Sequence, residues 1–534
     1  MYSTFHGLET SKRGVLTQSV ALNTVGHNIS NAATTGYTRQ RVNMQAAEAI
    51  YVPGYTRANT PGQLGTGVQY DSITRIRDSY LDMQFRRETQ ELGKNTVLNA
   101  TFESLQSIIN EPSNTGVSAI MDGFWNSLEV LNRDPNLLSA RVDFISKAQN
   151  MADTFNKIGT SLNTLEQDVE ANIAIKLTQA NNLLADIAKM NDTIRKVELT
   201  GDHANDYRDT RDLLIDELSK IVDVTYTEDA EGMVSIFSGG VNVVNALQTT
   251  PLTAANLPTI TGGEIKGYTQ SLEEINKVRN QLNALVDTLI NGAVDVTMPN
   301  GYKTQDIMVA KNAVTVLDET TTPATEIQYN AGDQIPAGSK IISSVTFEVN
   351  GFNGLHRLGY ALDGTTGLDF FSTKDNSTTF TIDNLVVNPI VKNDTNKVAA
   401  SGQYLGDFND PNFVPNAIKG NSDIALGLAS LRDVKFTYPS TLTSMSEGTS
   451  DDYFRAFVSE LGTSASVAKN NYKTSMDLQD NVEVRRQATS GVSIDEELTD
   501  LIRFQHAYNA SARNMTAIDE MLDRIINGMG LVGR

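Results

Sequence analysis

The strongest hydrophobic repeat of the chain lies in its last stretch, from Ser493 to Met529. Apolar residues there recur in alternating steps of four and three, which is the spacing of a coiled-coil seam. Polar residues occupy only two positions of the repeat, which comprises Ile494, Leu498, Leu501, Gln505, Tyr508, Ala512, Met515, Asp519, Leu522, Ile526 and Met529. Ser493 and Glu496 form the S-x-x-E pattern of a capping box, which predicts that a helix begins here. Because so narrow a stripe cannot fill a globular core, we expect this helix to pack against partner helices.

A weaker repeat lies at the other end of the chain. Leu8, Val15, Leu22 and Ile29 recur every seven residues, and most positions between them are polar or small. One apolar residue per heptad does not stabilise an isolated helix, because nucleation is costly and packing supplies most helical stability. We therefore expect this segment to be disordered alone and to become helical when it packs, with the C-terminal repeat as its complement.

The segment that follows Ile29 carries turn-forming residues. Asn28, Asn31 and Gly36 sit where the weak helix ends, and asparagine and glycine both favour turns there. Tyr37, Arg39 and Gln40 follow, with side chains long enough to reach across an interface. An ordinary helix end and loop would explain the asparagines and the glycine equally well. Prolines and glycines from Pro53 to Gly67 then predict extended or looped backbone as far as Tyr70.

Helical periodicity dominates the middle of the chain. It covers residues 78–109, 117–131, 142–197, 202–220, 272–289 and 451–488. The third of these would be a helix roughly 90 Å long at 1.5 Å per residue, a length typical of rods and bundles. Alternation at Val222, Val224 and Tyr226 predicts a strand, and threonine, valine, glycine and asparagine dominate residues 299–436. We interpret this last region as an inserted, mostly β domain that a short helix near Asp423 to Leu431 closes.

These elements predict a multidomain, mainly α protein with coiled-coil terminal helices, a long-helix bundle and an inserted, mostly β outer domain. The predicted terminal assembly domain, with its extended loop, comprises residues 1–75 and 491–534. The predicted bundle, with a small β-hairpin region, comprises residues 76–298 and 437–490. The outer domain comprises residues 299–436.

Composition narrows the classes of partner. The 534 residues carry a formal net charge of −21, which argues against nucleic acid and anionic membranes as partners. No run approaches the roughly 18 apolar residues of a membrane span, so no membrane insertion is expected. The first twenty residues lack the apolar core of a cleavable signal peptide. The absence of cysteine excludes disulfides and thiol chemistry. Two interpretations remain, a cytosolic protein or one exported unfolded by a route without a cleaved signal.

Motifs for catalysis are missing from the sequence. The five histidines show no metal-ligand spacing, and no nucleophile elbow, P-loop or strand-framed dinucleotide fingerprint occurs. We therefore predict no catalytic, cofactor-binding or metal-binding residues, and no enzymatic activity. One alternative is a glycan-binding or hydrolytic module in the β insert, where Asp363, Asp369 and Asp375 supply carboxylates of the kind used in glycoside hydrolysis.

Four stretches of the sequence resemble bacterial flagellar axial proteins, the rod, hook and hook-associated proteins. Residues 21–42, ALNTVGHNISNAATTGYTRQRV, resemble the N-terminal signature, although Ala33 and Thr35 replace the usual asparagine and proline. The G-Y-x-R-Q ending of that signature is closest to the FlgK family, whose members form the first hook–filament junction. Residues 205–220, 420–433 and 491–526 resemble the central helix, the segment that leaves the insert and the C-terminal helix of the same family.

The resemblance implies a structural adaptor that joins hook to filament and is not an enzyme. It implies an extracellular protein of the flagellum, exported unfolded by the flagellar type III apparatus. It also implies a homo-oligomeric ring between the hook protein and hook-associated protein 3, and a dedicated export chaperone at the C-terminal helix. The residues expected to carry assembly are Leu8, Val15, Leu22, Ile29, Leu498, Leu501, Tyr508, Ala512, Met515 and Leu522. The alternative within the same class is a hook or rod subunit.

Overall fold

The computed structural model describes residues 5–49, 65–304, 307–318, 321, 323–405, 416–441 and 443–528. The described chain forms two compact units. The first unit takes residues 1–97, 173–268 and 471–534, and the second takes residues 98–172 and 269–470. Four long helices contribute residues to both units: α2 (Ser79–Ile109), α4 (Leu138–Glu198), α6 (Gly263–Asn291) and α10 (Ser450–Ser490).

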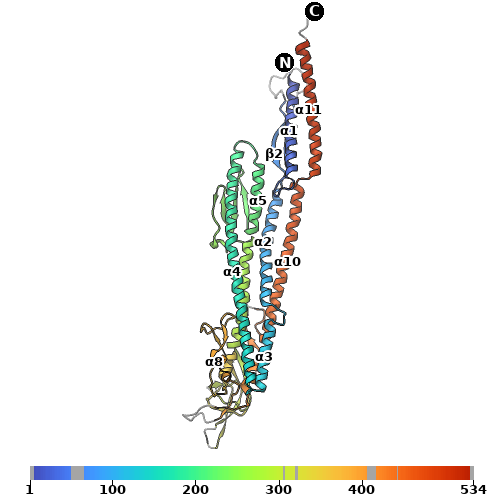
Figure 1. Cartoon of the computed structure of the whole chain (residues 1–534). Coiled ribbons are helices and arrows are strands. Elements are labelled where there is room, and N and C mark those ends of the chain that lie inside the picture. The colour runs from blue at the N-terminus through green and yellow to red at the C-terminus, as the bar shows by residue number, and fades with distance from the viewer. Residues whose placement is uncertain are drawn as a thin grey trace, which may run out of the picture. The chain divides into compact units, whose positions relative to one another are not determined.

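The first unit contains both ends of the chain. Helix α1 (His6–Asn31) lies beside α11 (Ile494–Gly528), as Figure 1 shows. Strands β1 (Gln40–Ala46) and β2 (Val68–Arg75) form an antiparallel ribbon that also contacts α1. Strand β2 begins inside the region predicted to be extended or looped as far as Tyr70 and continues beyond it to Arg75. Residues 50–64, most of which belong to that region, lie outside the described residues. The pairing of α1 with α11 confirms the predicted pairing of the terminal helices.

The apolar core of the first unit lies away from the paired termini. Part of α4 and all of α5 (Asn205–Ile221) pack on an antiparallel sheet in which neighbours along the chain pair. The sheet comprises β3 (Thr225–Glu228), β4 (Val234–Ser238), β5 (Val241–Asn245) and β6 (Gln248–Thr249). The strand predicted at Val222 to Tyr226 begins only at Thr225, because Val222 ends α5 and both Val222 and Val224 are buried in this core. A 3-10 turn (Ala254–Asn256) precedes α6.

The second unit joins α3 (Val117–Arg133) and parts of the long helices to the inserted region. Its core holds a cluster of aromatic rings. The ring centroids of Phe144 and Phe370 lie 4.7 Å apart, and those of Phe124 and Phe352 lie 5.6 Å apart. Short strands and helices follow in the order β7 (Ala293–Met298), β8 (Met308–Val309), β9 (Val314–Asp318), β10 (Thr325–Tyr329), β11 (Gln334–Ile335), β12 (Lys340–Ile341), β13 (Val345–Asn350), α7 (Gly351–Arg357), β14 (Phe371–Thr373), β15 (Leu385–Val387), α8 (Pro389–Asn393), a 3-10 turn (Thr395–Lys397), β16 (Tyr404–Leu405), β17 (Asn416–Ala417), α9 (Asp423–Ser430), β18 (Phe436–Thr437) and β19 (Glu447–Gly448). Their sheets have two or three strands.

The predicted fold class is therefore confirmed: the chain is mainly helical, its terminal helices pair, and small sheets occupy the middle region. Within the described residues, no helix combines the length and apolar character of a membrane span.

Candidate assembly interface

Helix α1 packs on α11 through small side chains. A Cβ atom added at Gly7 would lie 2.9 Å from Cδ1 of Ile518, and one added at Gly14 would lie 2.8 Å from Oγ of Ser511. The Nδ2 atom of Asn514 donates a hydrogen bond of 2.8 Å to Oγ of Ser11. Rising residue numbers on α1 thus meet falling numbers on α11, so the helices are antiparallel. At the two glycines the backbone of α1 approaches α11 more closely than a side chain would allow.

The buried face of α1 lies one position before the predicted repeat. Its buried residues are Ser11, Gly14, Thr17, Ala21, Thr24, Val25 and Asn28. The predicted residues Leu8, Val15, Leu22 and Ile29 are all half-buried. The signal that sequence reasoning missed is the seven-residue spacing of Gly7, Gly14, Ala21 and Asn28. Hydrophobic periodicity does not reveal this spacing, because small side chains add little to a hydrophobic core.

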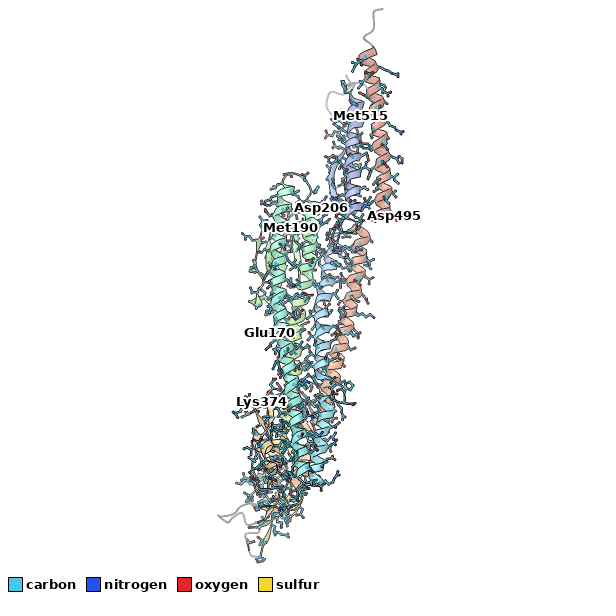
Figure 2. All side chains as sticks on the ribbon, in the orientation of Figure 1. Glu170, Met190, Asp206, Lys374, Asp495 and Met515 are labelled. Atoms are coloured by element: carbon cyan, nitrogen blue, oxygen red, sulfur yellow. The ribbon has the colours of Figure 1, made fainter. Side chains whose placement is uncertain are left out.

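The face of α11 is offset only in part. Among the predicted residues Leu522 is buried, Leu501, Tyr508, Ala512 and Met515 are half-buried, and Leu498 is 46% exposed. Figure 2 places Met515 in the second half of α11, far along the helix from Asp495 at its start. Gln505 and Asp519, the polar positions of the predicted repeat, are exposed, and Met529 lies outside the described residues. The contact also uses Glu497, Ser511 and Ile518, which lie one residue before Leu498, Ala512 and Asp519 and are each seven residues or a multiple of seven from the next. This offset keeps two polar side chains in solvent.

The turn after α1 is built around Asn28. Its Nδ2 atom donates to the carbonyl oxygen of Gln40 at 2.9 Å, and its Oδ1 atom accepts from Tyr37 Oη at 2.7 Å and from the amide of Gln40 at 3.0 Å. Asn31 donates to the carbonyl of His27 at 3.0 Å. Gly36 has a φ of +82°, and a Cβ atom there would also lie 3.3 Å from Leu213. The structure thus brings all these signature residues into one turn, in which Asn28 fixes the path into β1.

Arg39 connects this turn to the start of α11. Its Nε atom donates to Glu497 at 2.6 Å and its Nη1 atom donates to Glu496 at 2.7 Å, while Asp500 lies 3.7 Å from Nη2. The side chain of Glu497 is only 1% exposed and also accepts from Asn28 at 3.0 Å. The side chain of Glu496, which the sequence predicts to complete a capping box with Ser493, pairs with Arg39. The amide of Arg39 in addition donates to the carbonyl of Ser490 at 2.9 Å, so one residue contacts the end of α10 and the start of α11.

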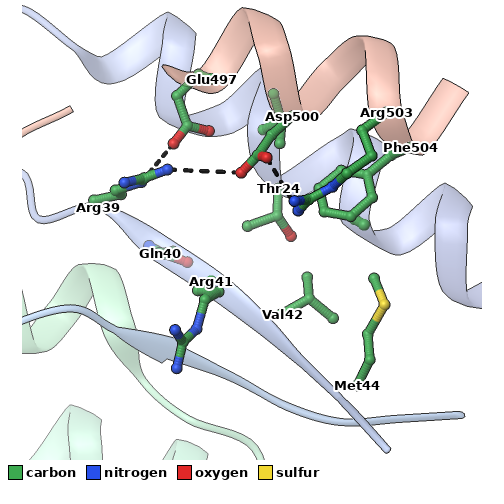
Figure 3. A pocket seen from close by; sticks show the side chains of 12 residues that line it. Thr24, Arg39, Gln40, Arg41, Val42, Met44, Glu497, Asp500, Arg503 and Phe504 are labelled. Carbon is green, nitrogen blue, oxygen red and sulfur yellow. Dashed lines mark hydrogen bonds and ion pairs between the residues drawn. The ribbon is translucent and has the colours of Figure 1, made fainter. Parts of the chain in front are cut away.

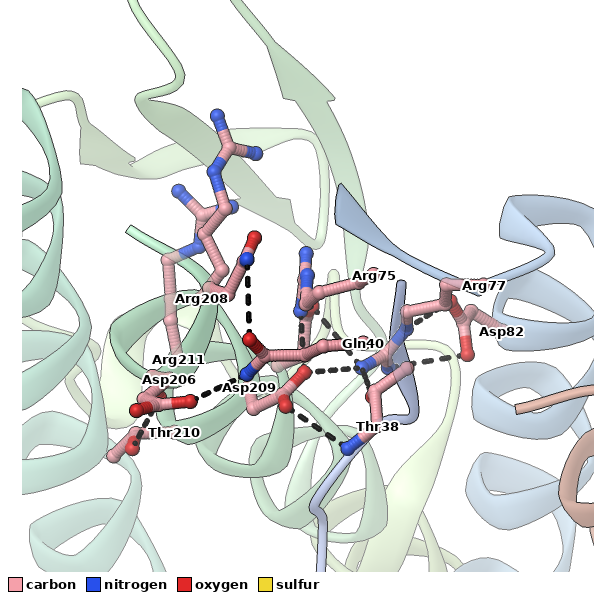
Figure 4. A network of polar contacts seen from close by, with 12 residues as sticks. Thr38, Gln40, Arg75, Arg77, Asp82, Asp206, Arg208, Asp209, Thr210 and Arg211 are labelled. Carbon is pink, nitrogen blue, oxygen red and sulfur yellow. Dashed lines mark hydrogen bonds and ion pairs between the residues drawn. The ribbon is translucent and has the colours of Figure 1, made fainter. Parts of the chain in front are cut away.

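A cluster of buried charges lies beneath the turn, as Figure 4 shows. Arg75 pairs with Asp209 at 2.7 Å and with Asp212 at 2.9 Å, and Arg77 lies 3.2 Å from Asp212. The cluster also contains Asp82, Arg86, Asp216 and Arg486. Thr38 and Gln40 attach the turn to it through Asp209 at 2.9 Å and Asp206 at 2.7 Å.

Two carboxyl groups of this cluster, those of Asp209 and Asp212, have pKa values shifted in opposite directions. Burial raises the pKa of Asp212, but Arg77, Arg75 and Arg86 together outweigh burial and hold it below its usual value. Burial also raises the pKa of Asp209, and there Arg75 and Thr38 offset burial only in part. Sequence reasoning missed this cluster, although Asp209, Asp212 and Asp216 recur at steps of three and four on one face of α5.

The three carboxylates considered for glycoside hydrolysis in the β insert each have a partner. Asp363 pairs with Lys397, Asp369 accepts from Arg357 at 2.7 Å, and Asp375 accepts from Asn384 at 3.2 Å. Each therefore has an evident structural role. Across the part of the chain that the structure describes, no group of three or more histidines and carboxylates is arranged to hold a metal ion.

Comparisons with known proteins extend over the whole chain. Residues 102–259 match the family described as the helical domain of flagellar hook-associated protein FlgK. Residues 486–528 match the family described as the C-terminal part of the flagellar basal body rod proteins FlgEFG. The second match covers the end of α10 and all of α11.

Flagellar hook-associated protein 1 of Bacillus subtilis is 31% identical over 537 residues, which cover 100% of both chains. The protein of the same name from Salmonella typhimurium is 25% identical over 96% of this chain and 98% of its own. Among solved structures, the flagellar hook junction protein FlgK from Burkholderia pseudomallei is 15% identical, with a TM-score of 0.44 over 76% of this chain and all of its own.

Proposed function

This chain belongs to the flagellar hook-associated protein 1 family, a structural, non-enzymatic family of the extracellular bacterial flagellum, and on that premise we propose that it joins the hook to the filament. Its copies would form a ring whose one side meets the hook protein and whose other side meets the second junction protein. The single observation that carries this proposal is the full-length relationship, with 31% identity over 100% of both chains.

The paired termini suggest how such a ring is assembled. The two helices meet through small and polar side chains, whereas the large apolar core of the first unit lies elsewhere. A pair with so little apolar contact gains stability when neighbouring copies cover it. We infer that nine of the ten residues predicted for assembly, all except the buried Leu522, are available for contacts between copies, since each of the nine is half-buried or exposed in one copy. The same weakness suits export in an unfolded state and binding of α11 by a chaperone before assembly.

Electron microscopy of isolated hooks mixed with the purified protein tests this function. A junction protein should add a thin zone to the hook end and then stop, and a mixture lacking the protein is the control. Bare hook ends would contradict the proposal. A variant that ends at Gly491 lacks α11, so it should keep the fold of the second unit but lose both attachment to hooks and chaperone binding.

A hook or rod subunit remains the second candidate, because residues 486–528 match the rod family. The same micrographs distinguish the two functions. A hook or rod subunit should extend the tube continuously as more protein is added, whereas a junction protein should saturate.

A further inference from the structure

A small pocket opens on one flank of α11. It has a volume of about 210 Å³ and is lined by α1, β1 and α11. Apolar side chains contribute Val25, Val42, Met44 and Phe504 to its lining, and Figure 3 shows the last three around it. Arg39, Arg41 and Arg503 also line it, together with the carboxylates of Glu497 and Asp500.

An apolar stripe lies elsewhere on the same helix. Ile494, Leu498 and Ile502 are spaced four residues apart, so they share one face of α11. They are 52%, 46% and 54% exposed, respectively. Three large aliphatic side chains in a row on one helix face form a continuous apolar surface, unlike scattered single residues.

Ile502, the last residue of the stripe, lies on the flank of α11 opposite the pocket. At 3.6 residues per turn, two residues separate Phe504 from Ile502 by about 200° around the helix axis. One copy therefore presents an apolar ridge on one side and an apolar pocket on the other. Two different complementary surfaces produce head-to-tail contacts, which close into a ring when the rotation between copies permits.

The charges beside the two surfaces are complementary. Arg41 lies at the pocket, is exposed, and forms no ion pair with another described residue. Asp495 lies three residues before Leu498, is also exposed, and has no cationic partner among the described residues. An acid beside the ridge and a base beside the pocket favour the same head-to-tail orientation.

We propose that neighbouring copies of this chain pack side by side through these two surfaces, with Ile502 of one copy entering the pocket of the next. Leu498 then packs against the pocket rim, and Asp495 faces Arg41. The inference rests on the proposed function for the assembly in which the contact forms, and it deepens that function by naming the surfaces through which copies meet.

Cysteine cross-linking tests the contact without background, because the natural chain has no cysteine. The variants Ile502→Cys and Val42→Cys are mixed in equal amounts, added to isolated hooks and oxidised. A disulfide forms only where the two Cα atoms come within about 7 Å, so a cross-linked dimer is expected. The matched control replaces Ile502→Cys by Ala517→Cys, an exposed α11 position farther along the helix, and should give no dimer.

A charge exchange gives a second readout. Arg41→Glu places an acid opposite Asp495, so the yield of cross-linked dimer should fall about tenfold or more. Adding Asp495→Arg should restore the yield, and circular dichroism of each variant shows whether its helices remain folded. Recovery in the double variant supports the contact, whereas an unchanged yield in Arg41→Glu contradicts it.

The outcomes separate this inference from the proposed function. If the unmodified protein attaches to hook ends but the Val42–Ile502 pair cross-links no better than the Ala517 control, the inference is wrong and the proposed function stands. If the unmodified protein does not attach to hooks, the proposed function is wrong and the inference falls with it.

Discussion

Replacing Arg39 with alanine should selectively loosen the contact between α1 and α11. Glu497 is 1% exposed at its side chain, and Arg39, 20% exposed, donates to it at 2.6 Å. Removing one partner of a buried ion pair costs about 3–5 kcal/mol, because a desolvated charge loses its counter-ion. Asn28 still donates to Glu497 at 3.0 Å, so the lower end, about 3 kcal/mol, is expected for Arg39→Ala.

Hydrogen exchange of the α1 and α11 amides measures this loss locally. A global unfolding curve would mix the two units, since a chain with several cooperative units does not unfold in two states. A loss of about 3 kcal/mol in local opening free energy speeds exchange on the order of 100-fold. Exchange in the aromatic core of the second unit should not change.

Arg503→Ala is the matched control on the same helix. Arg503 pairs with Asp500 at 3.0 Å, but its side chain is 67% exposed, and an exposed pair contributes only about 0–1 kcal/mol. Equal exchange rates in Arg39→Ala and Arg503→Ala would refute the reasoning, because burial of Glu497 would then have no energetic consequence.

Three further predictions follow from packing and titration. Gly14→Val should cost about 1–3 kcal/mol of α1–α11 stability by overpacking against Ser511, whereas Gly26→Val, with no atom within 4 Å of its Cβ, should cost little; exchange of α11 amides compares the two. Asp212→Asn should be less stable than the natural chain, and the full stability difference should be present above pH about 4. Below that pH the difference should shrink, because a carboxyl with a lowered folded-state pKa stabilises the fold only while it is ionised. Amide protection in α5, compared between pH 7 and pH 3 for both proteins, checks this. Burial, only partly offset by the Leu368 carbonyl, lowers the pKa of His356 to about 4. On acidification His356 therefore binds a proton in the unfolded chain before it does so in the folded one. The free energy of unfolding of the second unit should fall by about 2 kcal/mol between pH 7 and pH 5. Urea unfolding followed by the fluorescence of Trp125, the single tryptophan, measures this free energy at each pH. If a His356→Gln variant lost the same free energy between pH 7 and pH 5, the assignment of the loss to His356 would be wrong.

Helix positions were predictable because each helix carries its own periodic signal. The 61-residue α4 and the 35-residue α11 repeat apolar residues at helical spacing over many turns, so their existence needs no knowledge of the rest of the chain. The strand expected from Val222 is present but begins only at Thr225, because alternation of valines also occurs where a chain leaves a helix and enters a core. Only the sheet that α5 packs on distinguishes these two cases.

The contact between the termini was predictable as a pairing but not in its register. A Leu8-to-Ile29 repeat and a Gly7-to-Asn28 repeat differ by one residue, and both lie along one side of α1. The choice depends on how closely two backbones approach, which is a property of the pair and not of either helix. The three-part division of the chain and the contacts between copies stay predictions.

The sequence by itself determined that both ends of this chain are helical, that they lack a core of their own, and which family they resemble. Only the tertiary structure decided that Arg39 meets Glu497 and that Arg86 meets Asp216, since these pairs join residues 458 and 130 positions apart. Local periodicity records which face of a helix avoids water. The partner of a charge depends on how distant segments pack, and no local pattern encodes it.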